Sequence, residues 1–139
     1  MNLQRLIVAI TLTGGSLLFS NPTTAQLIPS AKKASHVRIT EGPALESTQD
    51  AWVIITWKSN NPGGSDEHYG VVHYGTGPKQ LSQTAKSHIR LNQKHSYTVF
   101  RVRVDDLQPR TTYYYTVDSI GADGSSDGVV SPISKFTTR

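Results

Sequence analysis

The chain has 139 residues, enough for one domain behind a short leader and too few for two well-packed domains. Its formal net charge is only +4, and its Lys and Arg residues are scattered, which argues against a nucleic-acid-binding surface. The sequence contains no cysteine, and this excludes disulfides, thiolate metal sites and a cysteine nucleophile.

The first 25 residues have the character of a secretory signal peptide. Arg5 precedes an apolar run at residues 6–19. The small residues Thr23 and Ala25, which follow this run, predict cleavage after Ala25. A membrane anchor is the alternative, but the run is shorter than the roughly 20 apolar residues that span a bilayer. Gly14 and Gly15 also interrupt it. We therefore expect a secreted or periplasmic protein without a membrane span after cleavage.

Cleavage removes 25 of the 139 residues and leaves 114, with a formal charge that falls from +4 to +3 because Arg5 is lost. Residues 26–35 have no periodicity and are expected to form a flexible leader. The folded domain is expected to occupy residues 36–139.

Within the domain, short segments rich in Val, Ile, Thr and Tyr alternate with turn signals about every ten residues. Seven strands are predicted, at 36–40, 51–59, 68–75, 86–91, 96–104, 112–119 and 129–138. The Gly-Pro kink and polar residues at 41–50 are expected to form a connection. Pro132 lacks a donor and predicts that the last strand lies at a sheet edge or starts after a bulge. Seven strands of this length favour two antiparallel sheets packed face to face.

Three tyrosines lie in succession in the segment "LQPRTTYYYTV". Because side chains alternate along a strand, Tyr113, Tyr115 and Val117 share one face, which we assign to the core. Tyr114 lies on the other face. The alternating set Val53, Ile55 and Trp57 is likewise assigned to the core.

These residues resemble a known fold family. Six positions match the spacing L-x-P-x-T-x-Y-x-Y-x-V of fibronectin type III domains: Leu107, Pro109, Thr111, Tyr113, Tyr115 and Val117. Trp57 is similar to the tryptophan that those domains bury on their second strand, and Tyr74 matches an inward position of the third. The resemblance implies an all-β, seven-stranded immunoglobulin-like antiparallel β-sandwich. It also implies that the Tyr113 hydroxyl bonds back to the upstream backbone.

One branch of that family is closer in detail. "VVHYGT", followed by "HSYTVFRVRVDDLQPRTTYYYTV", resembles the domain that precedes the catalytic domain of purple acid phosphatases, over residues 36–138. Those enzymes hold two metal ions in a separate α/β domain with the patterns D-x-G, G-D-x-x-Y, G-N-H-[DE] and G-H-x-H. None of these patterns occurs in the sequence, so the resemblance implies an accessory module.

No cofactor, metal site or catalytic residue is predicted. The five histidines, which are His36, His68, His73, His88 and His95, lack the spacing of a metal site, although distant loops could bring them together. A calcium site at Asp118, Asp123 and Asp127 lacks the ligand spacing of an EF-hand loop. The chain offers no apolar strand-to-helix context for the nucleophile elbow of a serine hydrolase, and the G-x-S-x-G pattern at residues 124–128 lies in a turn-like segment.

Aromatic side chains on the outward faces supply the candidate partner surface. If Val53, Ile55 and Trp57 face the core, Trp52 and Ile54 face outward and form one patch. The same alternation predicts a second patch on the opposite sheet, formed by Tyr69, Val71, His73 and Tyr114. Exposed aromatic groups can mark a contact surface, but Lys and Arg stems can cover them instead.

Two functions remain open. One is a secreted, non-catalytic fibronectin-like module that binds a protein or a cell-envelope glycan. The other is an accessory domain or fragment of a purple acid phosphatase-type metallophosphoesterase, in which acid phosphatase activity and metal binding would reside in another domain.

Overall fold

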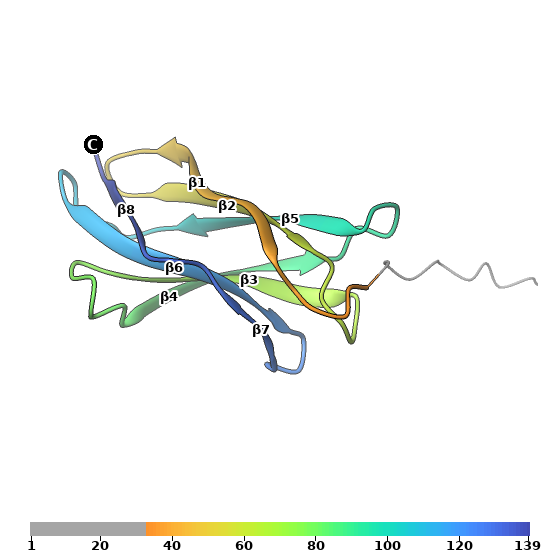
Figure 1. The fold of residues 1–139 in the computed structure, drawn as a ribbon. Coiled ribbons are helices and arrows are strands. Elements are labelled where there is room, and N and C mark those ends of the chain that lie inside the picture. Colours follow the sequence, from red (N-terminus) through yellow and green to blue (C-terminus); the bar gives the residue numbers. More distant parts are fainter. Residues whose placement is uncertain (1–32) are drawn as a thin grey trace, which may run out of the picture.

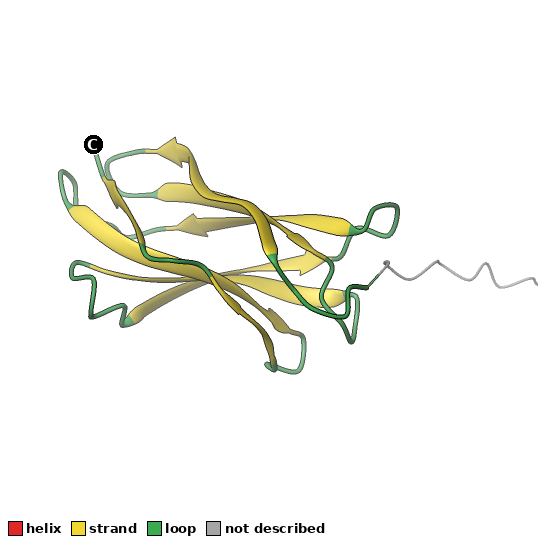
Figure 2. Cartoon of the chain, viewed as in Figure 1, coloured by secondary structure: helices red, strands yellow, loops and turns green. Residues whose placement is uncertain are grey.

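The computed structural model describes residues 33–139, which form two layers of β-strands (Figure 1). The predicted signal peptide and residues 26–32 of the predicted leader lie outside the described residues. Figure 2 shows strands and loops without a helix in the described part of the chain. None of residues 33–139 forms a helix of the length and apolar character of a membrane span.

Eight strands make up the two antiparallel sheets. Their bounds are β1 Ile39–Thr48, β2 Val53–Asn60, β3 Glu67–Gly75, β4 Gln83–Arg90, β5 Tyr97–Val104, β6 Thr112–Gly121, β7 Ser126–Val130 and β8 Ser134–Thr137. One sheet has the order β1-β2-β5, and the other has the order β4-β3-β6-β7, with β8 also paired to β6. The chain enters the sandwich at one end and its C-terminus lies at the other (Figure 1). The all-β sandwich predicted from the sequence is confirmed.

The first strand is longer than predicted and begins later. The expected connection at 41–50 is mostly strand, because β1 stays paired with β2 through three register shifts that absorb its Gly-Pro and polar residues. Gly42 makes one of these shifts possible: its φ is +79°, and a Cβ there would lie 3.0 Å from the carbonyl oxygen of Thr56. An edge strand tolerates such irregularity because only one of its sides is paired.

The predicted last strand is divided into β7 and β8. Pro132 separates them and has no N–H to donate, and the Ser131 hydroxyl instead accepts a hydrogen bond from the Val117 N–H at 2.9 Å. The segment lies at the edge of the five-stranded sheet, as predicted from Pro132.

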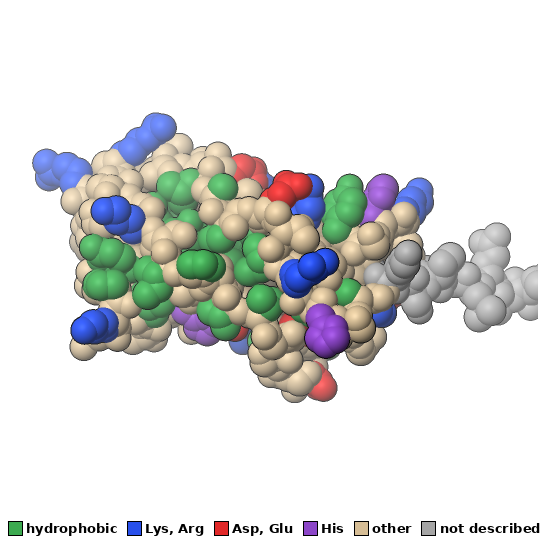
Figure 3. Space-filling model, in the orientation of Figure 1, with side chains coloured by type: hydrophobic (Ala, Val, Ile, Leu, Met, Phe, Trp, Pro, Cys, Tyr) green, Lys and Arg blue, Asp and Glu red, His purple; other side chains and the backbone are tan. Residues whose placement is uncertain are grey.

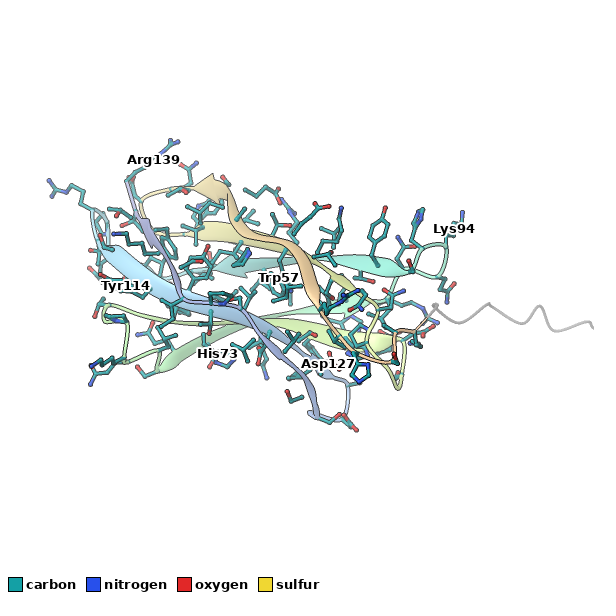
Figure 4. The ribbon with its side chains drawn as sticks, viewed as in Figure 1. Trp57, His73, Lys94, Tyr114, Asp127 and Arg139 are labelled. Atoms are coloured by element: carbon teal, nitrogen blue, oxygen red, sulfur yellow. The ribbon has the colours of Figure 1, made fainter. Side chains whose placement is uncertain are left out.

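The core fills the space between the two sheets, where Figure 4 places Trp57. It comprises Val53, Ile55, Trp57, Val72, Tyr74, Leu91, Phe100, Val102, Val104, Leu107, Tyr113, Tyr115, Val117 and Phe136. The rings of Trp57 and Phe100 stack with their centroids 5.2 Å apart. Gly70 leaves room for this pair, because a Cβ there would lie 3.0 Å from the Trp57 ring. The inward alternation predicted for β2 therefore determines how the core is filled.

The three tyrosines of β6 have different environments. The Tyr113 hydroxyl accepts a hydrogen bond from the Gln108 N–H at 2.9 Å, which is the contact that the resemblance implied. Tyr115 is buried, and burial raises its pKa because a charged phenolate is poorly solvated there. Tyr114 is half-buried on the outer face. Tyr113 therefore holds the corner between β5 and β6, and Tyr113 and Tyr115 are part of the hydrophobic core.

The last residues of the predicted leader are attached to the sandwich. The Ala34 N–H donates to the carbonyl of Asn61 at 2.9 Å. The Lys33 ammonium donates to the Ser65 carbonyl at 3.1 Å and forms an ion pair with Asp66. The folded part of the chain therefore includes Lys33 and Ala34.

Candidate functional site

The outer face of the three-stranded sheet carries a groove beside exposed apolar residues. The groove has a volume of about 380 Å³ and is formed by β1, β2 and β5. It is lined by Glu41, Gly42, Ala44, Thr56, Trp57, Lys58 and Val99. We call it the Val99 groove. The register shift of β1 between Glu41 and Ala44 shapes one wall, and outward residues of β2 and β5 shape the other.

Two side chains of β5 extend the groove with apolar surface. Val99 is 48% exposed and Tyr97 is 37% exposed, at alternate positions of the strand whose other side chains fill the core. The Tyr97 ring stacks on the His95 ring with centroids 5.0 Å apart. The Lys58 ammonium lies 5.0 Å from the centroid of Tyr97 and also pairs with Glu41. The site thus combines an aliphatic side chain, an aromatic platform and an ion pair at its rim.

The rest of that sheet face is covered by ion pairs. Arg101 donates two hydrogen bonds to the Glu46 carboxylate, and these bonds hold the pKa of Glu46 below its usual range. Arg103 donates to Asp105 at 2.7 Å. The apolar surface is therefore concentrated at the Tyr97 and Val99 end of β5.

The first predicted patch is covered in part. Trp52 and Ile54 are half-buried, and the guanidinium of Arg103 lies over the Trp52 ring, 4.1 Å from its centroid. Such a stacked arginine shields the ring from solvent and from a partner.

The second predicted patch lies on one face of the five-stranded sheet, but its members are not equally accessible. The expectation that Val71 is exposed is wrong, because it is 3% exposed. Its neighbours across the sheet are Lys86 and Asp118, and Asp118 is paired with His73 at 3.1 Å, so these longer side chains cover the valine.

The remaining members of that patch have partners of their own. Tyr69 packs edge-on against His88 with centroids 5.3 Å apart, and the Lys86 ammonium lies 5.9 Å from its ring centroid. Tyr114 and His73 are half-buried on the same sheet (Figure 4). Burial raises the pKa of the Asp118 carboxyl, and the charge of His73 opposes this effect.

Other exposed large hydrophobic residues are Leu45, Val130 and Ile133. They belong to β1, to β7 and to the connection that leads into β8. These elements run along the face drawn in Figure 3, where hydrophobic side chains gather.

The five histidines have separate environments. His36 contacts Ser35, His68 contacts Asp127, His73 contacts Asp118, His88 contacts Glu67 and His95 stacks on Tyr97. Within residues 33–139 the structure brings no three metal-ligating side chains together. The three aspartates of the calcium alternative are each bonded to another side chain: Asp123 to Ser125, Asp127 to His68 and Asp118 to His73.

A serine, a histidine and an aspartate do meet, in an order that does not suit hydrolysis. The Ser119 hydroxyl donates to Asp127 at 2.6 Å, and the same carboxylate oxygen lies 2.9 Å from His68 Nδ1. A nucleophilic serine must instead bond to the histidine that takes its proton. Ser119 is also buried, so the cluster has a structural arrangement.

Comparisons with known proteins agree with the sandwich. The chain is similar to the sensor domain of the anti-sigma factor RsgI4 of Pseudobacteroides cellulosolvens. In its shorter form the identity is 18% and the TM-score 0.52, covering 76% of this chain and 97% of that one. In its longer form the identity is 17% and the TM-score 0.50, covering 73% of this chain and 88% of that one. The fn3 domain of human contactin 1 is 16% identical, with a TM-score of 0.46 over 86% of this chain and 92% of that one.

At these identities the two RsgI4 structures show the fold alone. A comparison with curated protein sequences finds no match. The family model described as "Purple acid Phosphatase, N-terminal domain" matches residues 33–138, which includes every described strand. The chain therefore belongs to the purple acid phosphatase N-terminal domain family.

Proposed function

We propose that the protein is a secreted, non-catalytic accessory module that binds a protein partner through the Val99 groove. The observation that carries the proposal is the exposure of Tyr97 and Val99 beside a groove on a sheet face. Exposed apolar side chains that line a groove and are rimmed by charges are typical of interaction sites. The signal-like first 25 residues support secretion.

The chemistry of the groove favours a protein partner over a glycan. Val99, Ala44 and Gly42 offer an apolar surface for an aliphatic or aromatic side chain. The Lys58–Glu41 pair at the rim can exchange its partners for backbone or charged groups of a second protein. A sugar ring would have only the Tyr97 ring to stack on, so a protein is the favoured partner. Binding of a glycan is the alternative outcome of the test.

A pair of valine variants tests this surface. Val99→Asp places a charge in the groove and is expected to lower retention of the partner from the envelope fraction at least tenfold, because an unpaired carboxylate would be desolvated on contact. Val130→Asp is the matched control, since Val130 is 58% exposed but lies on the other sheet, and it is expected to retain binding. Equal losses in both variants, or none in either, would contradict the proposed surface. Loss of the retained species to glycosidase and not to protease would assign a glycan.

The second candidate function is an accessory domain of a metallophosphoesterase, and family membership favours it. In that case acid phosphatase activity resides in a metal-binding domain outside the described sandwich. We expect the purified chain to release no phosphate from a chromogenic ester, with or without added iron and zinc. Metal-dependent turnover by the purified chain would overturn the non-catalytic assignment.

A further inference from the structure

His68 is a buried histidine whose two ring nitrogens both face oxygen atoms. It is 1% exposed, at the start of β3. Its Nδ1 lies 2.9 Å from Asp127 Oδ2, and its Nε2 lies 2.9 Å from the carbonyl oxygen of Ser65. A carbonyl oxygen can only accept, and an ionised carboxylate can only accept. A neutral imidazole has a single N–H and can satisfy one of these contacts.

A neutral ring beside a carboxylate therefore has one proton too few to form both hydrogen bonds. The Ser119 hydroxyl indicates where that proton lies, because it donates to the same Oδ2 atom at 2.6 Å. Two donors on one oxygen suit a carboxylate, so a proton on each ring nitrogen of His68 satisfies every contact of the cluster. Without that proton, a nitrogen lone pair would face an oxygen in a site that excludes water.

The cluster joins segments that are far apart in the sequence. Ser65 belongs to the loop between β2 and β3, and Asp127 belongs to β7, which follows the turn after β6. Figure 4 shows Asp127 near the end of the sandwich where the described chain begins. A cavity of about 210 Å³ lies between the two loops, and a neighbouring one has about 520 Å³; both are lined by Gly63, Gly64, Ser125 and Asp127. His68 lines the smaller cavity, and its bonds to Ser65 and Asp127 connect the two loops there.

The other charged groups around the cluster have partners of their own and do not take the place of His68 beside Asp127. Hydrogen bonds from Ser125 lower the pKa of Asp123 in the turn, and the charge of His68 adds to this effect. Asp118 on β6 faces Asp127 but is paired with His73 on the outer face. Lys33 is paired with Asp66 beside the β2–β3 loop. Among the described residues, His68 and Ser119 form side-chain hydrogen bonds with the Asp127 carboxylate.

We propose that the proton on His68 is a pH-dependent latch that holds the β6–β7 turn against the β2–β3 loop. The proton passes to solvent as pH rises, and one N–H···O contact is then lost. The closed form binds one proton more than an open form in which the ring is in water. A free imidazole loses its proton near pH 6.5. The latch is therefore complete below about pH 6.5, and above it the opening equilibrium rises about tenfold per pH unit.

Nitrogen NMR of the imidazole tests the latch directly. In ¹⁵N-histidine-labelled protein we expect His68 to show protons on both ring nitrogens at pH 7.5. Amide exchange of residues 121–128, corrected for the intrinsic pH dependence, is expected to rise about tenfold per pH unit above about pH 6.5 for as long as the closed form keeps the proton. A His68 ring with a single proton at pH 7.5 and an unchanged turn would overturn the proposal.

Asp127→Asn is the informative variant. Its amide can donate to a neutral His68 Nδ1 while Nε2 donates to Ser65, so both contacts are satisfied without the extra proton. We expect the pH dependence of exchange in 121–128 to disappear in this variant and to persist in His73→Gln, which removes an ion-paired histidine on the outer face. Persistence in Asp127→Asn would contradict the latch. If Asp127→Asn does not fold, the wild-type ring spectrum decides the question.

Discussion

Trp57→Ala is expected to lower the free energy of unfolding by about 3 to 5 kcal/mol, because truncation of a buried aromatic residue leaves a cavity. Trp57 is 3% exposed and stacks on Phe100, whose ring loses its main contact in the variant. The measurement is urea denaturation followed by far-UV circular dichroism, with the midpoint and slope fitted together. The mutation also removes the Trp57 ring that packs against Gly70, where there is no room for a Cβ.

Trp52→Ala is the matched control for this prediction. Trp52 is only half-buried on the outer face, where its ring contacts the Arg103 guanidinium. Removal of such an exposed stacked pair is expected to cost about 1 kcal/mol or less. Equal losses at Trp52 and Trp57 would show that the assignment of inward and outward faces on β2 is incorrect.

Asn61→Ala is expected to lower the free energy of unfolding by about 2 to 4 kcal/mol, because it leaves several buried hydrogen-bonding groups without a partner. Asn61 is fully buried after β2. Its amide nitrogen donates to the His95 carbonyl at 2.8 Å, and its amide oxygen accepts from the Thr98 hydroxyl at 2.6 Å. These bonds hold the loop between β4 and β5, which carries the His95 ring against Tyr97.

The same variant links stability to the Val99 groove. Since Asn61 positions the loop, its loss is expected to broaden the NMR signals of residues 92–97 before the rest of the domain unfolds. Ser96→Ala, at an exposed position of the same loop, is the control and is expected to change stability by less than about 0.5 kcal/mol. A similar small effect in Asn61→Ala would show that this amide does not hold the loop.

Strand alternation and turn residues predicted most of the fold, because every second residue of a strand lies on the same face and the apolar residues therefore identify the buried face. Trp57, Tyr113 and Tyr115 are buried as their spacing indicated. The segment at 41–50 was not predicted as strand, since its pairing depends on register shifts against β2 that have no local signal. Pro132 indicated an irregular edge but not that the last segment divides in two.

The candidate site was less predictable than the fold. Alternation places Tyr97 and Val99 outward on β5, but the groove exists only because β1 bulges beside them. Conversely, Trp52 and Val71 lie on the expected faces, yet Arg103, Lys86 and the His73–Asp118 pair cover them. Coverage by long side chains depends on cross-strand register, which the sequence pattern does not specify.

His68 shows the same limit for a buried polar group. Its inward position follows from the alternation of β3, but its partner Asp127 is 59 residues away in the chain. Only the pairing of β6 with β3 and β7 brings the two together. The segment rich in Gly, Asp and Ser around Asp127 therefore takes part in a buried contact with His68 that its composition does not reveal.

The most direct test of the Val99 groove is an NMR titration of the ¹⁵N-labelled domain with the partner retained from the envelope fraction. We predict that amide signals shift or broaden at residues 41–44, 56–58 and 97–99, which surround the groove. Signals of the outer face of the five-stranded sheet, at 69–73 and 114, should stay unchanged. Changes confined to that second face, with the groove residues unaffected, would contradict the account.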